Sequence, residues 1–316
     1  MIIGNPAPRD DTRLAVFVIL VTVFALSLGD SVIKKISAEF TLWQIFTVRS
    51  FFVVPVLFAL VKLRREKTPF WPQRFGWTLL RSAMLTFMWV AYYIALPHVD
   101  LAIAAAAYYT LPLFITLFAA YFLGDTIGRT GWAAVVMGFV GVLLILQPEA
   151  EQFSWFSALP LLSAVLYALA MILTRSRCRN ENVFVLSAWL NISMLSVGVV
   201  ASLALVLFGS ERRGFLLGPW STMGSNEWGV IGLLSIAIII GSVGAAIAYQ
   251  RGRSSTVAAF DYAYVAFAAI WGFLLFQEAP NLKATIGVVL VVCAGILAVR
   301  GKEASGASEQ GSAVDV

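Results

Sequence analysis

About ten long apolar segments make up most of this chain. A helix that crosses a lipid bilayer needs about 20 predominantly apolar residues. Since lipid offers no hydrogen-bonding partner to backbone amides and carbonyls, we expect runs of this length to be helices. The sequence therefore predicts an all-α integral membrane protein with ten transmembrane helices, at residues 14–36, 41–62, 77–97, 101–123, 130–147, 153–174, 183–208, 228–249, 255–276 and 283–300.

The amino-acid composition excludes a soluble globular protein. Hydrophobic residues make up 60% of the chain, charged residues 12%, and the mean hydropathy is +0.87. Soluble domains carry about 25% charged residues, so this chain has too little charge to cover a water-exposed surface. The net charge of +5 would favour nucleic acid or another acidic partner for a soluble chain. In a membrane protein its distribution between loops indicates topology instead, and we expect no nucleic-acid partner.

Basic residues are distributed unequally between the two sides of the predicted membrane. With the N-terminus in the cytoplasm, the cytoplasmic segments carry 15 Lys and Arg residues and the external segments carry 5. Cytoplasmic loops have such an excess, so both tails, residues 1–13 and 301–316, are predicted to be cytoplasmic. The first apolar run is too long for a signal peptide and lacks a small-residue cleavage site. We therefore expect a multi-pass protein of a bacterial-type inner membrane.

Two stretches of the chain repeat one design. Residues 101–148 and 260–299 each contain an apolar run, an acidic turn and a second, glycine-spaced apolar run. The acidic positions lie 153 residues apart, about half the chain, which indicates an internal duplication. The corresponding positions are Asp125 and Glu278, Gly131 and Gly287, and Gly138 and Gly295.

Two related halves of five helices must have opposite orientations, because the second copy starts after an odd number of crossings. We therefore expect inverted five-helix repeats at residues 14–147 and 153–300. Several carrier folds use such repeats and bind substrate between them, near the middle of the membrane. The duplication and the helix count are therefore enough by themselves to favour a carrier.

The repeated motif also resembles the paired repeat of the EamA-type drug/metabolite transporters, over residues 14–300. That pattern is an apolar helix, a Leu-Gly-acidic turn, and a helix with G-x6-G or G-x7-G spacing. This chain departs from it at Asp125, where Glu is commoner, and in its first turn, which is three residues shorter than the second. The resemblance implies amino acids, cofactors or related metabolites as substrates, with export the commoner direction.

Two charged residues fall within the first two predicted spans. Asp30 lies about six residues before the end of span 14–36, and Arg49 about eight after the start of span 41–62. A charge inside the hydrocarbon layer costs roughly 2.5–3.5 kcal/mol on insertion scales, so we expect an ion pair between Asp30 and Arg49 to offset that cost. The pair has two interpretations. It is a structural ion pair that holds the two spans together, or it is a functional site that binds a substrate carboxylate or acts as a proton-linked switch.

Asp261 lies about a turn and a half into the predicted span 255–276, and helical spacing places it on one face with Tyr264. No basic residue lies within one turn on that face, so desolvation favours the neutral carboxyl. A proton-coupled carrier uses such a group. Two interpretations remain open. Asp261 is a substrate or proton site, or it is half of a gate at the cytoplasmic end, paired with Arg251 or Arg253.

Aromatic residues are concentrated in the middle of the chain, and we take Trp89, Tyr92, Tyr108 and Tyr109 as further candidates for substrate binding. Aromatic side chains in membranes often lie at the interfaces or simply pack. However, Tyr108 and Tyr109 precede Pro112 by about a turn, well inside a span. A proline there frees a backbone carbonyl that a cavity, a water or a substrate must satisfy. Phenol groups at that depth would suit a ring or a polar small molecule.

The sequence contains no Walker, Rossmann, HExxH or nucleophile-elbow motif. It has one histidine, His98, and two cysteines without CxxC spacing, so we expect no metal and no cofactor. A lipid-modifying membrane enzyme would need a cluster of His, Asp or Glu at one membrane face, which the sequence lacks. A non-transporting scaffold would not need Asp30, Arg49 and Asp261 inside its spans.

These observations predict a non-enzymatic secondary transporter of a small organic metabolite. Without an ATP site, it is expected to be gradient-driven or facilitative. The family resemblance favours export, and proton-coupled or facilitative uptake is the alternative. The expected partners are the small molecule, membrane lipid and protons, with the protein a monomer or a homodimer.

Overall fold

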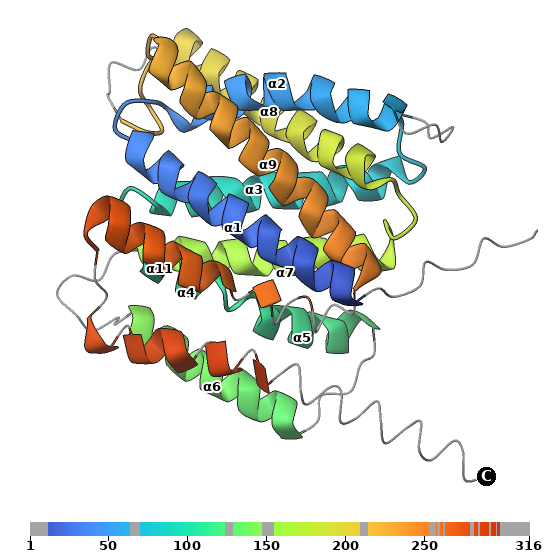
Figure 1. Ribbon diagram of the computed structural model, residues 1–316, viewed down its shortest axis with the longest axis vertical. Helices are drawn as coiled ribbons and strands as arrows, with labels where there is room; N and C mark the ends of the chain where they lie inside the picture. Colours follow the sequence, from blue (N-terminus) through green and yellow to red (C-terminus); the bar gives the residue numbers. More distant parts are fainter. Residues whose placement is uncertain are drawn as a thin grey trace, which may run out of the picture.

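Every regular element in the described part of the chain is a helix (Figure 1). The computed structural model describes residues 12–63, 70–123, 129–146, 155–208, 214–252, 257, 260–261, 263–278, 281–283, 285–290, 292–294 and 296–297. In chain order the elements are α1 (Thr12–Ile36), α2 (Leu42–Leu63), α3 (Phe75–Ala95), α4 (Leu101–Tyr108), α5 (Leu111–Leu123), α6 (Arg129–Leu146), the short 3-10 helix η1 (Trp155–Ala158), α7 (Leu159–Ser176), α8 (Val183–Phe208), α9 (Ser225–Arg251) and α11 (Ala263–Phe276).

Seven helical segments among the described residues are long and apolar enough to cross a membrane. They coincide with seven of the predicted spans, those at 14–36, 41–62, 77–97, 101–123, 153–174, 183–208 and 228–249. The three remaining predicted spans coincide with helices outside that set, namely α6, α11 and helical residues between Thr285 and Ala294. The prediction of an all-helical membrane protein is therefore confirmed, and ten crossings remain a prediction.

The predicted span 101–123 is divided into α4 and α5, with Tyr109–Thr110 between them. Pro112 accounts for the break, because proline lacks the backbone N–H that would donate to the Tyr108 carbonyl in a continuous helix. The Thr110 hydroxyl donates to a carbonyl one turn earlier, at 2.8 Å. Tyr108 and Tyr109 are both buried at the break, so the interruption brings two phenol side chains into the interior of the bundle.

Helices from the two halves of the chain pack against each other. α1 lies along α9, α2 along α8, α3 along α7, and α4 against α11. Figure 1 shows the first two of these pairings, blue α1 beside orange α9 and α2 beside yellow α8. Further contacts join α1 to α11, α5 to α7, α3 to α8 and α2 to α9. The core therefore lies between the two halves.

Close packing between helices depends on small residues at several points. A Cβ atom added at Gly244 of α9 would lie 2.0 Å from the Thr22 hydroxyl of α1, and one at Gly241 would lie 2.3 Å from Leu26. Gly138 of α6 is equally tight against Leu113 of α5, at 2.1 Å. Small residues at helix interfaces let backbones approach closely in membranes. Gly124, Asp125, Gly128 and Pro148, parts of the repeated motif, lie outside the described residues.

Large apolar side chains cover the outer surface of the bundle. Phe17 is 66% exposed, Phe51 62%, Phe139 62% and Leu207 78%. Exposed apolar area on this scale is unusual for a protein in water, whereas lipid tails are as apolar as these side chains. The surface thus fits a hydrocarbon environment, in agreement with the apolar helices.

Candidate functional site

A cavity of about 50 Å³ lies inside the bundle, between helices of both halves. Side chains of α1, α3, α4, α7, α8, α9 and α11 form its wall. The structure brings together seven of the eight residues singled out in the sequence. These are Asp30, Trp89, Tyr92, Tyr108, Tyr109, Asp261 and Tyr264.

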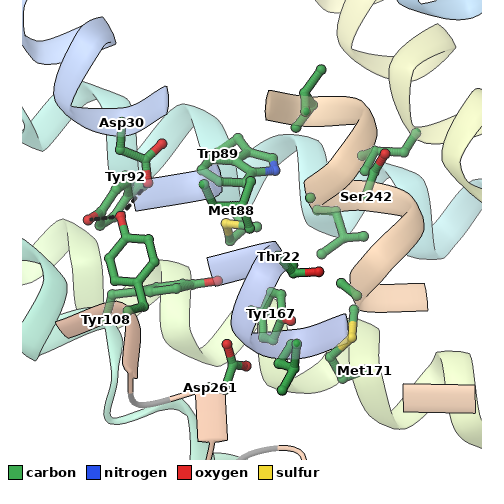
Figure 2. Close-up of a pocket in the computed structure, with 18 of the residues that line it drawn as sticks. Thr22, Asp30, Met88, Trp89, Tyr92, Tyr108, Tyr167, Met171, Ser242 and Asp261 are labelled. Carbon is green, nitrogen blue, oxygen red and sulfur yellow. Dashed lines mark hydrogen bonds between the residues drawn. The ribbon is translucent and has the colours of Figure 1, made fainter. Parts of the chain in front are cut away.

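Asp30 lies on the cavity wall, 2% exposed, and accepts hydrogen bonds from two phenols. The Tyr93 hydroxyl donates to its Oδ1 at 3.0 Å, and the Tyr264 hydroxyl donates to its Oδ2. The hydroxyls of Tyr264 and Tyr92 lie 3.1 Å apart and extend this network into the cavity (Figure 2). Asp30 therefore joins α1, α3 and α11 through one carboxylate.

Arg49 is the eighth candidate, and the structure places it outside the cavity wall. It is 1% exposed, its Nη2 donates to the Met194 sulfur at 3.3 Å, and its guanidinium lies 5.4 Å from the centre of the Phe46 ring. The expected direct ion pair with Asp30 is not formed, and that prediction is wrong. The phenol of Tyr93, which donates to Asp30, interacts electrostatically with both charges. Tyr93 of α3 thus takes the place beside Asp30 that the sequence analysis gave to Arg49.

Asp261 has the same kind of environment as Asp30. Its side chain is 3% exposed. Its Oδ1 accepts a hydrogen bond from the Tyr109 hydroxyl at 3.1 Å, and its Oδ2 accepts one from the Tyr249 hydroxyl at 2.9 Å. The proposed gate partner Arg251 is exposed, and Arg253 lies outside the described residues. Phenols rather than a cation therefore occupy both carboxylate oxygens.

The phenol rings also form a continuous aromatic wall. Tyr109 stacks on Tyr264 with ring centres 4.9 Å apart, and Tyr108 lies 5.2 Å from Tyr92 and 5.8 Å from Tyr167. Figure 2 shows Asp30 and Asp261 at separate places on the cavity wall, with Tyr108 between them. An aromatic wall with two carboxylates suits a polar molecule that also carries apolar or ring atoms.

Sequence reasoning missed Arg81, which lies in α3 and lines the same cavity at 2% exposure. Its Nε donates to the Thr174 hydroxyl of α7 at 2.6 Å. The available signal was its position inside the predicted span 77–97, because an ionisable residue within a span is a functional candidate by default. Tyr167 and Tyr249, also in this cluster, gave no such signal, since tyrosine is common in spans.

An ion pair joins three helix ends beyond the cavity. Lys34 Nζ lies 2.5 Å from Glu278 Oε1 and donates to the Val99 carbonyl at 2.6 Å. Glu278 Oε2 accepts from the Leu101 N–H at 2.9 Å, at the start of α4. Burial and the Glu278 carboxylate raise the pKa of Asp100 beside them, and Lys34 acts in the opposite direction. The contacts tie the ends of α1 and α11 to the beginning of α4.

Cys178 lies in the loop after α7, at the end of the bundle nearer to Arg81. Burial raises the pKa of the Cys178 thiol, and the nearby Arg81 charge acts against this. The thiol is buried and Cys293 is exposed; neither forms a disulfide. Within the described residues no group of three or more His, Cys, Asp or Glu side chains is placed to hold a metal ion.

Comparison with known proteins agrees with this architecture. The chain matches the EamA-like transporter family over residues 13–147 and 154–300. It is 26% identical to the pseudopaline exporter of Pseudomonas aeruginosa over 295 residues, 93% of this chain and 99% of that one. It is 27% identical to a riboflavin transporter of Rhizobium johnstonii, covering 77% of each chain. It is 23% identical to an S-adenosylmethionine uptake transporter of Rickettsia conorii, covering 86% of this chain and 88% of that one.

A crystal structure of a protein at 18% identity superposes with a TM-score of 0.62, covering 92% of this chain and 96% of that chain. At this identity the likeness concerns the fold alone. The two family matches together span most of the sequence, and the relatives are named as transporters of small molecules. The chain belongs to the EamA-like transporter family and is a small-metabolite transporter of the membrane, not an enzyme.

Proposed function

We propose that this protein is a secondary transporter that exports a small organic metabolite, an amino acid, a cofactor or a similar molecule, across the inner membrane. The observation that carries the proposal is the cavity between the two halves, with two buried carboxylates and a wall of phenols. Export is favoured because the relative named an exporter aligns over 93% of this chain. Uptake is the alternative, since another relative is named an uptake transporter.

The size of the cavity supports alternating access. At about 50 Å³, it has room for about one or two waters, since each takes about 30 Å³ in the liquid. Sites for drug-sized ligands measure about 300–1,000 Å³. A metabolite therefore needs the halves to separate at one membrane face, and then at the other. The Lys34–Glu278 ion pair, at one end of the bundle, is one of the contacts such an opening must break.

The pattern of helix contacts supports two structurally related halves. If the predicted spans are paired between halves, α1 corresponds to α7, α2 to α8, α3 to α9, and the α4–α5 span to α11. Exchanging each helix for its counterpart converts the α1–α9 contact into the α7–α3 contact, and α1–α11 into α7–α5. It also converts α3–α8 into α9–α2, and all of these contacts are present. A pseudo-two-fold relation between residues 14–147 and 153–300 accounts for this correspondence.

The proposed topology has both termini in the cytoplasm. Its support is the excess of basic residues in alternate loops and the meeting of Lys34 and Glu278, both assigned to the external face, at one end of the bundle. Reporter fusions after Arg177 and after Lys302 are expected to be active for a cytoplasmic reporter and inactive for a periplasmic one. The reverse pattern at both sites would contradict the topology and the inverted arrangement with it.

The transport proposal is tested by reconstituting the full chain into liposomes that contain a labelled extract of cellular metabolites. We expect a small set of metabolites to leave these vesicles faster than from protein-free liposomes, with and without a pH gradient. Mass spectrometry of the external medium identifies them, and proteoliposomes with the extract outside test the opposite direction. If no metabolite moves in either direction, the proposal is wrong; if metabolites only enter, the uptake alternative replaces export.

A further inference from the structure

The central cavity contains more hydrogen-bond donors than the described protein atoms satisfy. Three of its lining side chains have a buried polar atom with no hydrogen-bond partner: Arg81 Nη1, Thr22 Oγ1 and Ser242 Oγ. They come from α3, α1 and α9. The large majority of buried side-chain polar atoms in proteins have a partner. Nine such atoms lack one among the described residues, and the three whose side chains line the cavity are the ones that a bound molecule could satisfy.

The acceptors in the cavity are already engaged. Asp30 and Asp261 each accept hydrogen bonds from two tyrosine hydroxyls. Neither carboxylate lies within 4 Å of the Arg81 guanidinium, because among the described residues the ion pair at that distance is Lys34–Glu278. Arg81 is thus a buried cation whose side-chain hydrogen bond goes to a neutral hydroxyl, that of Thr174.

An anionic oxygen is the chemistry that matches these donors. A guanidinium has five N–H donors in a planar fork and forms bidentate bonds with carboxylate and phosphate. The Thr174 contact fixes the Nε side of the fork, and Nη1 of this cavity-lining side chain remains without a partner. Hydroxyls of threonine and serine donate to anionic oxygens as well. An unpaired buried charge is costly, so a ligand anion also stabilises the protein at this point.

We propose that Arg81, together with the hydroxyls of Thr22 and Ser242, forms a subsite that binds a carboxylate or phosphate group of the transported molecule. This inference rests on the proposed function, in that the cavity is taken to be the place where substrate binds. It narrows the substrate class to metabolites that carry an anionic oxygen group. The aromatic wall and the phenol-bonded carboxylates hold the rest of the molecule.

The test measures binding to the purified full chain in detergent, by the shift in thermal unfolding midpoint against ligand concentration. Three probes share a benzene ring: phenylacetate carries a carboxylate, phenyl phosphate a phosphate, and phenylacetamide no charge. We expect at least one anion to bind about tenfold more tightly than the amide, since charge-assisted bonds are about twice as strong as neutral ones. Tighter binding of phenylacetate would indicate a carboxylate as the natural ligand group, and tighter binding of phenyl phosphate would indicate a phosphate.

Variants assign the preference to the subsite. Arg81→Gln is expected to reduce the anion preference to within about twofold, and Thr22→Val and Ser242→Ala to weaken it in part. Arg49→Gln is the matched control, because it removes another buried arginine that does not line the cavity. We expect Arg49→Gln to keep the wild-type ratio of anion affinity to phenylacetamide affinity, whatever its effect on the thermal stability of the protein.

Arg81→Lys provides a second variant in case Arg81→Gln does not fold. Lysine keeps the charge without the planar fork, so the anion preference is expected to fall at least about threefold. The proposal is overturned if the wild type binds neither anion more tightly than phenylacetamide, or if the preference survives unchanged in the Arg81 variants. If the anion preference depends on Arg81 but no metabolite moves in liposomes, the anion subsite is supported and the transport proposal is rejected. If metabolites move but the anion preference is absent, transport is supported and the subsite is rejected.

Discussion

Asp261→Asn is expected to abolish concentrative transport and to leave substrate exchange across the membrane intact. The substitution keeps the size of the side chain and an oxygen that accepts from a phenol, but an amide cannot take up or release a proton. Asp261 is 3% exposed, and its two oxygens accept from Tyr109 and Tyr249 rather than from a cation. Within the described part of the chain, the Arg49 charge acts on Asp30 but no arginine charge acts on Asp261, which makes Asp261 the best candidate for a proton site.

The measurement compares two fluxes on the same proteoliposomes. A pH difference of one unit corresponds to about 1.36 kcal/mol, which sustains about tenfold accumulation if one proton moves per substrate. We expect the wild type to approach this ratio and Asp261→Asn to stop at equal concentrations, with exchange still measurable. Tyr249→Phe is the control, since it removes one hydrogen bond and keeps the carboxyl group, and it should remain coupled. An Asp261→Asn protein with wild-type accumulation and pH profile would rule out the coupling role.

The membrane class and the helices were predictable because lipid imposes a strict rule on sequence. A spanning segment must be long, apolar and helical, so the segments Leu42–Leu63 and Ser225–Arg251 are visible as runs of residues without any knowledge of packing. The division of span 101–123 was only half visible. Pro112 marked the place, but a proline is compatible with either a kink or a full break, and the neighbouring helices decide between them.

The partners of the buried charges were not predictable from local spacing. Asp30 was assigned to Arg49 because the two spans are adjacent in sequence, whereas its phenol donors Tyr93 and Tyr264 lie 63 and 234 residues away. Apolar residues cover every side of these helices, so periodicity does not reveal which side faces the cavity. For the same reason, the sequence could not show that Arg81 and Asp261 share one cavity.

Exchanging the charges of Asp30 and Arg49 is expected to fail as a rescue. If the two formed a direct ion pair, the double mutant Asp30→Arg/Arg49→Asp would recover what each single mutant loses. In the structure Asp30→Arg instead places a guanidinium against two phenol hydroxyls that had donated to a carboxylate. Arg49→Asp places a carboxylate beside a thioether and over the face of the Phe46 ring, which is negative and repels it.

Each single substitution introduces a charge that has no partner at its buried site, and such a charge costs about 3–5 kcal/mol; the double mutant combines both costs. We expect the yield of folded, monodisperse protein in fluorescence-detected size-exclusion chromatography to be no higher for the double mutant than for either single mutant. The matched comparison is Lys34→Glu/Glu278→Lys, where the oxygen and nitrogen lie 2.5 Å apart. There a swap restores the ion pair and should recover part of the yield, although the bonds to Val99 and Leu101 are lost. Recovery of folded protein in the Asp30/Arg49 swap, to the same degree as in Lys34/Glu278, would mean that those two charges pair directly in the membrane after all.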